Sequence, residues 1–425
     1  MSNSFAFIVM LTAARDIMSS GTNKVPTDRD LTNSTSSVDS TAFCEKTINR
    51  NECRVEPLGV VLLANIIPAF FIKSIVPFFM HRLPFSLIHI TVCACQATSY
   101  ILVSFTSSVQ MSLLGVVFAA IGCGLGDICY LALASHYHRD TISFWSSGTG
   151  ASGILASLTY AVLTEPHLAN FSPHATLLIM LVVPLQFFLT YFLLLSPAQT
   201  VYHPKIAQPR TWLIPEEAQF HSAVESEISY TQVGEPLMDK KLLNEKMTAG
   251  KRMRVVWTLL RYIAPLTFVY FCDFVVNQGL TAFMVFDCNH GLDLSPVSQY
   301  RWYQVTYCVG SFFARSSTNF FHLPYVFLIV FPFLEALNAV FFFFNSLYFF
   351  IPHIWLVFAL IFAQGLIGGL AYANTYYRIH KEVDPSIREF SLACTTMSDA
   401  IGIMAAGLST LPIHSAICGF YTGAR

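Results

Sequence analysis

Ionisable side chains occur deep inside the most apolar stretches of this 425-residue chain. Lys73 lies within the apolar run 58–80, and Asp273 lies in the middle of the run 262–286. A charge in the hydrocarbon core of a bilayer costs several kcal/mol, so such residues face a cavity or a partner. A buried ammonium can bind an anion or neutralise an acid, whereas a buried carboxylate, which burial biases towards its neutral form, can take and release protons.

Each of the two residues also has a structural interpretation. Lys73 either binds a substrate or a counter-charge, or it extends its long side chain to the nearer membrane face, about 10 Å away at helical rise. Asp273 precedes Asn277 and Gln278, and its four-residue spacing from Asn277 places both on one helical face. Asp273 is either a proton carrier or the permanent partner of Arg301 or Arg315, and the two are compatible if that pair opens during transport.

Further polar residues occur at membrane depth in other apolar segments. Each of three further acids has two possible roles, one in transport and one in a structural hydrogen bond: Asp127, Glu335 and Asp399. The small-residue segment 145–153 formally contains G-x-G-x-x-G, but no strand precedes it, as a dinucleotide site requires. We expect a tight helix contact there, with Ser147 and Thr149 free to line a polar path.

The elements that must position these residues are membrane helices. A bilayer core about 30 Å thick needs about 20 apolar residues in a helix. Such runs recur at 58–80, 85–105, 113–134, 142–163, 175–195, 255–286, 297–314, 325–344, 354–377 and 390–411, and a shorter one at 5–14. They predict an all-α polytopic membrane protein of about eleven transmembrane helices in a two-bundle, major-facilitator-like architecture. The halves are 1–197, with an incomplete first helix, and 255–425, joined by a polar linker at 198–254.

The distribution of positive charge predicts the orientation. The alternate connections 81–84, 135–140, 196–254, 315–323 and 378–389 hold fourteen of the 24 Lys and Arg residues. The positive-inside rule puts these connections in the cytosol. Two N-x-S/T sequons, at Asn33 and Asn170, then fall on the opposite side, where glycosylation takes place. The basic residues 251–254 would contact anionic lipids of the cytosolic leaflet.

The linker also carries short patterns typical of trafficking signals. Asp239, Leu242 and Leu243 form an acidic-dileucine pattern, and residues 230–233 fit Y-x-x-Φ. Sorting adaptors would read such patterns in a cytosolic loop. Cys44 and Cys53 share the first non-cytosolic loop, and whether they are bridged stays open because spacing does not settle connectivity.

Composition excludes several classes of protein. Hydrophobic residues make up 54% and charged residues 12% of the chain, against about 25% charged in soluble globular proteins. A net charge of −1 gives no indication of nucleic-acid binding. Neither a metal-ligand spacing nor a hydrolase or metalloprotease motif is present in the sequence, so we expect no metal, no cofactor and no enzyme.

Several long and uncommon strings give the chain a resemblance to a known family. They include Gly124-Leu125-Gly126-Asp127, residues 138–150, residues 276–280, residues 299–304, residues 314–317 and residues 368–372. On these strings the chain resembles the battenin family of endolysosomal membrane proteins. Asp127 and Asp273 stand where that family commonly has Glu, and Gln364 replaces an acid usual there.

The resemblance implies a lysosomal and late endosomal protein related to the major facilitator superfamily. It further implies transport of glycerophosphodiester-type solutes, a role in lysosomal pH homeostasis, and transport of basic amino acids such as arginine. We therefore expect alternating access around a midplane cavity, with Lys73 and nearby amides holding a small polar or anionic solute and Asp273 coupling it to protons. The alternative is a non-transporting membrane scaffold that controls endolysosomal trafficking.

Overall fold

The computed structural model describes residues 1–19, 58–78, 83–106, 108–134, 137, 140–196, 249–318 and 320–423. The elements of the first half are α1 (Ser2–Thr12), α2 (Ala14–Ser19), α3 (Gly59–Ile75), η1 (Val76–Phe78), α4 (Phe85–Phe105), α5 (Val109–Ala134), α6 (Asp140–Thr164), α7 (Pro173–Ile179), α8 (Val182–Leu189) and η3 (Thr190–Leu194). Those of the second half are α10 (Ala249–Phe274), η5 (Val275–Leu280), η6 (Thr281–Phe283), α11 (Pro296–Ser317), α12 (Tyr325–Tyr348), α13 (Ile354–Glu382), α14 (Pro385–Thr395) and α15 (Met397–Gly423).

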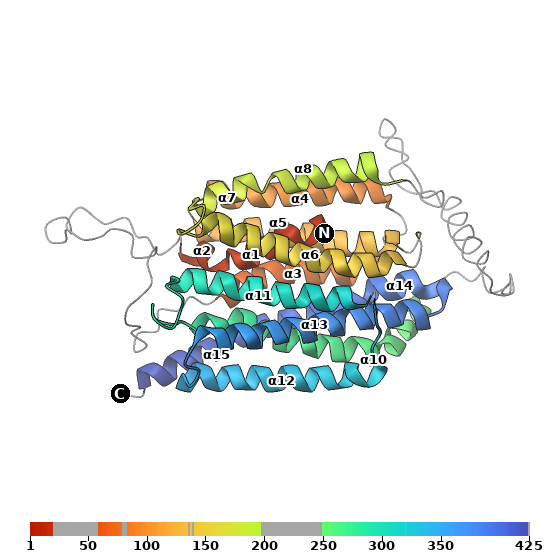
Figure 1. The fold of residues 1–425 in the computed structure, drawn as a ribbon. Helices are drawn as coiled ribbons and strands as arrows, with labels where there is room; N and C mark the ends of the chain where they lie inside the picture. The colour runs from red at the N-terminus through yellow and green to blue at the C-terminus, as the bar shows by residue number, and fades with distance from the viewer. Residues whose placement is uncertain are drawn as a thin grey trace.

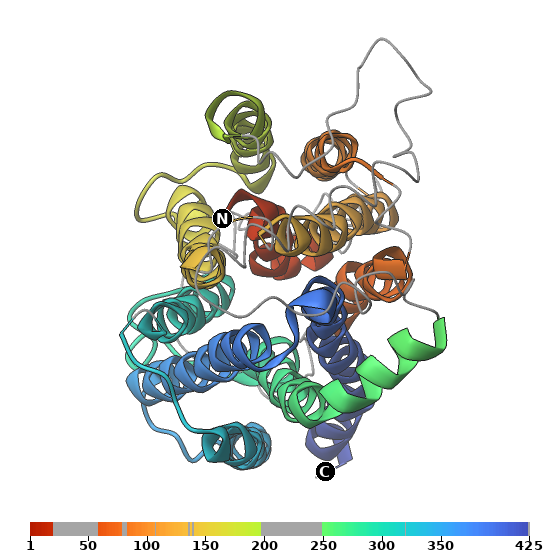
Figure 2. The ribbon, with the colours of Figure 1, turned by 90° about the vertical axis from the view of Figure 1, so that its right-hand side faces the viewer.

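The helices form one bundle of near-parallel rods, in which the first half lies above the second in Figure 1. We call the end where η3 stops and α10 starts the linker end, and the end where α6 stops and α11 starts the far end. Helix α6 packs against α11 and α3 packs against α15, so these two pairs join the halves (Figure 2). A Cβ at Gly150 of α6 would lie 2.9 Å from the Cα of Phe312, which shows how closely α6 and α11 approach.

The protein is an all-helical multi-pass membrane protein, as the apolar runs predict. Seven helical stretches among the described residues are long and apolar enough to cross a membrane. Helices α1 and α3 are shorter, with 11 and 17 residues, and α6 and α11 are long but rich in small and polar residues. All four lie within the same bundle, so the expected arrangement of about eleven rods in two halves is present (Figure 1).

Two helices that the hydropathy pattern treats as continuous are interrupted. Helix α10 passes into the π-helix η5 two residues after Asp273, and a short 3-10 turn, η6, follows. Thr396 separates α14 from α15, and its hydroxyl donates a hydrogen bond to the carbonyl of Ala393 at 2.7 Å. Hydroxyl bonds to the local backbone compete with regular helix, and π-turns often mark functional sites.

The first apolar runs differ from their expected bounds. The run 5–14 belongs to α1 and α2, with Val9 and Met10 fully buried in the bundle. Helix α3 ends at Ile75 rather than near residue 80, so Lys73 lies in its last turn. The apolar run extends beyond the helix because it includes the apolar 3-10 turn Val76–Phe78, which hydropathy does not distinguish from α-helix.

Candidate functional site

A cavity of about 140 Å³ lies between the two halves. Helices α1, α3, α5 and α6 of the first half line it together with α10, α11, α13 and α15 of the second. Its wall combines apolar residues with a few polar and charged ones, and the latter are Ser4, Lys73, Asp127, Thr149, Asn277, Gln304, Ser311, Arg315 and Asp399. A concave site with a small number of convergent polar groups is typical of small-molecule binding.

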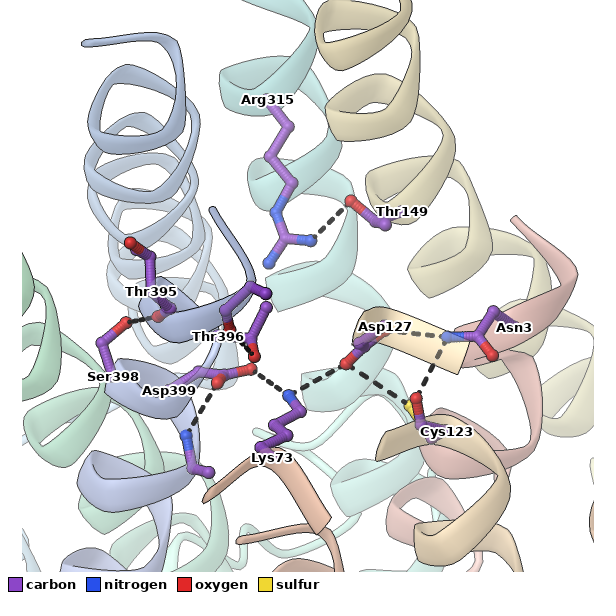
Figure 3. A network of polar contacts seen from close by, with 12 residues as sticks. Asn3, Lys73, Cys123, Asp127, Thr149, Arg315, Thr395, Thr396, Ser398 and Asp399 are labelled. Carbon is purple, nitrogen blue, oxygen red and sulfur yellow. Dashed lines mark hydrogen bonds and ion pairs between the residues drawn. The ribbon is translucent and has the colours of Figure 1, made fainter. Parts of the chain in front are cut away.

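Lys73 forms ion pairs with two carboxylates that are far from it, and from each other, in the sequence. Its Nζ lies 2.9 Å from Oδ2 of Asp127 on α5 and 2.8 Å from Oδ2 of Asp399 on α15 (Figure 3). The Lys73 side chain is 5% exposed, so it does not extend to the membrane face. The group carries two negative charges and one positive charge, and its ammonium is already neutralised. We call these three residues the Lys73 cluster.

Neighbouring groups hold the carboxylates of the Lys73 cluster in place. Asn3 of α1 donates from Nδ2 to Oδ1 of Asp127 at 2.8 Å and to the carbonyl of Cys123 at 3.2 Å. Asp399 lies in the first turn of α15, and its Oδ1 accepts a hydrogen bond from the backbone N–H of Ala400 at 2.8 Å. The cluster therefore joins α3 and α5 of the first half to α15 of the second, and Asn3 connects α1 to it.

Arg315 is the cation of this cavity that lacks a carboxylate partner within the described residues. Its Nη1 donates to Oγ1 of Thr149 at 3.0 Å (Figure 3). Its Cζ lies 4.3 Å from the ring centre of Tyr372. Its Nε–H has no acceptor within that part of the chain. A guanidinium held by a hydroxyl and an aromatic face keeps hydrogen-bond donors available for a ligand.

The π-helix η5 presents two amide side chains. Asn277 lines the cavity, is 2% exposed, and neither its Oδ1 nor its Nδ2 meets a partner in the described residues. Gln278 turns away and accepts a hydrogen bond from the hydroxyl of Tyr300 at 2.8 Å. Gln304 of α11 donates a hydrogen bond from Nε2 to the backbone carbonyl of Asn277 at 3.3 Å, which stabilises the π-helix η5. Asn277 thus offers a donor and an acceptor to a bound solute.

Asp273 lies behind the cavity wall, inside the second half, with no exposed surface. The hydroxyl of Tyr307 donates to its Oδ2 at 3.3 Å, and Nε2 of Gln364 donates to its backbone carbonyl at 3.1 Å. Its carboxyl also interacts with that of Glu335 on α12, which packs against α10. Neither Arg301 nor Arg315 forms an ion pair with it, so in this structure it is not the permanent partner of either arginine.

Arg301 binds Asp16 at the far end of the bundle. Its Nη2 lies 2.5 Å from Oδ1 of Asp16, and its Nε lies 3.2 Å from Oδ2. The hydroxyl of Tyr160 donates to the same Asp16 carboxylate at 3.0 Å, and Nη1 of Arg301 donates to the carbonyl of Thr164 at 3.4 Å. This bidentate pair joins α2 and α6 of the first half to α11 of the second.

The remaining predicted residues lie outside the cavity or outside the described residues. Ser147 is half-buried on α6 and is not among the described residues that line the cavity. Asn170 is exposed between α6 and α7. Asn33, Cys44, Cys53, Asp239, Leu242 and Leu243 lie outside the described residues. In the described part of the chain, no group of His, Cys, Asp and Glu side chains could hold a metal ion.

Several site residues were not predicted. Asn3 and Asp16 lie on either side of the short first apolar run, 5–14, where no periodic pattern singles them out. Tyr307 and Tyr372 are two of the many aromatic residues in the helices. Tyr372 does occur in a string that carries the family resemblance, which could have identified it. Asp16 could have been found as an acid directly beyond an apolar run.

Comparison with known proteins gives consistent matches over nearly the whole chain. The sequence profile of the family described as CLN3 protein matches residues 1–420. Battenin of Canis lupus familiaris is 35% identical over 425 residues, covering 98% of this chain and 89% of the relative. Protein BTN1 of Yarrowia lipolytica is 32% identical, covering 86% of this chain and 87% of the relative.

A solved structure shares the fold at low sequence identity. The human organic anion transporter MFSD10 (TETRAN) superposes with a TM-score of 0.51 and 14% identity, covering 86% of this chain and 80% of that one. This likeness bears out the expected major-facilitator-like architecture. It agrees with a cavity lined by both halves of the bundle.

Proposed function

This chain belongs to the CLN3 protein family, the family of battenin, and from that premise we propose that it carries small anionic solutes of the glycerophosphodiester type across a membrane by alternating access. Membership and fold make it a membrane transporter-like protein. The family resemblance further suggests lysosomal and late endosomal membranes as its location, and a contribution to lysosomal pH homeostasis.

The observation that carries the proposal is that Arg315 faces the cavity without a carboxylate partner in the described residues. Its guanidinium lines the cavity and pairs with no carboxylate in the described residues, whereas Lys73 already pairs with Asp127 and Asp399. A phosphodiester anion matches the planar donor fork of arginine. We therefore assign anion contact to Arg315 rather than to Lys73, with Thr149 and Asn277 binding the polar groups of the solute.

Alternating access requires contacts between the halves that can break. Two ion pairs have this character: Asp399 with Lys73 in the cavity, and Arg301 with Asp16 at the far end. The Arg301–Asp16 pair would hold the far end closed while the linker end opens. Opening of the far end would then require separation of Asp16 from Arg301, with the rest of each half moving as a body.

Basic amino acids such as arginine are the second class of solute. The Lys73 cluster carries one more negative than positive charge, which would attract a cationic side chain. Such a solute would bind at Asp127 and Asp399 and would not need Arg315. The Arg315 variants below therefore separate the two classes.

Binding to the purified full-length protein tests the proposal. Glycerophosphoglycerol, which carries a phosphodiester charge and no cation, is titrated by calorimetry into wild type and Arg315→Gln. Loss of a charge-assisted contact worth about 1.5–3 kcal/mol would weaken binding about 10- to 100-fold. Arg261→Gln is the matched control, because the Arg261 side chain is 61% exposed on α10.

The outcomes separate the candidate functions. Weaker phosphodiester binding by Arg315→Gln, with unchanged binding by Arg261→Gln, supports the anion carrier. Binding of arginine that both variants retain favours the basic amino acid. Absence of binding for both solutes favours the non-transporting scaffold, whose adaptor-binding linker segment would then be the functional part.

A further inference from the structure

Two buried carboxyl groups, Asp273 and Glu335, face one another inside the second half of the bundle. We propose that this pair is a proton-binding site, and that a proton bound there moves together with the anion. The inference rests on the proposed function, because it assigns the coupling ion of the same carrier. It makes the protein a proton–anion symporter.

The pair is enclosed by protein. Asp273 of α10 and Glu335 of α12 have no exposed surface, α10 packs against α12, and the two carboxyl groups interact across that interface. A Cβ at position 368 would collide with Oδ2 of Asp273, so Gly368 of α13 makes the room that this carboxyl occupies. The two acids therefore meet in a space that three helices shape around them.

No basic side chain neutralises the pair. Within the described residues neither acid forms a salt bridge, and the two Glu335 oxygens accept no hydrogen bond from an N–H or hydroxyl donor. Two carboxylates side by side in a dry interior repel each other, and one shared proton turns that repulsion into a hydrogen bond. The second carboxyl thus provides the acceptor for a proton on the first.

Tyr307 connects the pair to the cavity. It lines the cavity wall and donates a hydrogen bond to Oδ2 of Asp273 at 3.3 Å. The other polar and titratable neighbours are Gln364 of α13, which donates to the Asp273 carbonyl, Tyr270 and Cys272 of α10, and Arg315 of α11. A proton from cavity water can therefore reach Asp273 across one hydroxyl.

Arg315 supplies the link between anion and proton. Its positive charge acts on the Asp273 carboxyl from the cavity. An anion bound to Arg315 neutralises this charge, so the pair then takes up a proton more readily. By reciprocity, a protonated pair strengthens anion binding. Anion and proton therefore bind together and cross in the same direction.

Proton uptake on binding tests the inference in the intact protein. Glycerophosphoglycerol is added to the purified full chain in weakly buffered solution with a pH indicator, and calorimetry is repeated in buffers of different ionisation enthalpy. Wild type should take up a proton with the solute, up to about one per bound molecule. Glu335→Gln should bind the solute with no proton uptake, and Asp273→Asn should do the same.

Glu382→Gln is the matched control, since Glu382 lies at the end of α13 with its side chain 36% exposed. It should take up the proton as wild type does. Should Glu335→Gln fold poorly, infrared difference spectra of wild type replace it, and a protonated-carboxyl band must grow when the solute binds. Solute binding by wild type without proton uptake or without that band overturns the inference and leaves the proposed function standing. Failure of wild type to bind the solute overturns the proposed function itself.

Discussion

Nζ of Lys73 and Oδ2 of Asp399 lie 2.8 Å apart and tie α3 of the first half to α15 of the second. The same ammonium pairs with Asp127 of its own half, so it keeps one partner if Asp399 moves away. Separation of the halves along this seam therefore need not leave Lys73 as an isolated buried charge. In the proposed carrier, Lys73 is a reversible connection between the halves, and Arg315 is the cation that receives the solute.

Lys73→Met should destabilise the protein. It leaves Asp127 and Asp399, whose side chains are 17% and 20% exposed, facing each other without a cation. Loss of one member of a buried ion network costs about 3 kcal/mol, so we expect a clear fall in the unfolding temperature in detergent. Lys381→Met, at an exposed position of α13, is the control and should unfold as wild type does. Equal unfolding temperatures for the two variants would show that the cluster contributes nothing to stability.

Asp16→Asn should loosen the far end of the bundle. It removes the charge that receives both Arg301 contacts and the hydrogen bond of Tyr160. Hydrogen–deuterium exchange should become faster in peptides 158–166 and 296–303, since their helices separate more often. Peptide 378–389, at the linker end, serves as the internal control. Unchanged exchange in the far-end peptides would rule out the Arg301–Asp16 pair as a closing contact.

Asn277→Ala should lower the affinity for the solute without lowering the stability of the protein. The two polar atoms of Asn277 meet no partner in the described residues, so their removal relieves a buried unsatisfied group that costs about 1–3 kcal/mol. We expect an unfolding temperature equal to or above that of wild type, with glycerophosphoglycerol affinity reduced about tenfold by the loss of hydrogen bonds to the solute. Gln278→Ala, which breaks the bond to Tyr300, should instead lower stability. Unchanged affinity in Asn277→Ala would remove this amide from the site.

The sequence is sufficient to predict the apolar rods and the two halves, because helix length and hydropathy follow directly from the bilayer. It also singles out Lys73, Asp127, Asp273 and Asp399, since ions at membrane depth stand out by their energetic cost. Their partners depend on packing: Lys73 and Asp399 are 326 positions apart, and no local pattern brings them together.

The hydropathy pattern could not predict where the helices are interrupted. Mean hydropathy depends on composition alone, so it shows neither the π-helix after Asp273 nor the break at Thr396. Both interruptions nevertheless lie beside residues of the cavity wall, Asn277 and Asp399. The partner of Arg301 was missed for a related reason. Asp16 lies in the six-residue helix α2, too short for a periodic pattern to define.

Uptake into proteoliposomes tests the central claim most directly. Radiolabelled glycerophosphoglycerol is offered to vesicles that contain the purified full chain and are preloaded with the unlabelled solute, so that exchange requires no gradient. Wild type and Arg261→Gln should accumulate the label, and Arg315→Gln should not exceed empty vesicles, because the anion loses its guanidinium. Exchange by Arg315→Gln at the wild-type rate would contradict the claim that Arg315 receives the solute.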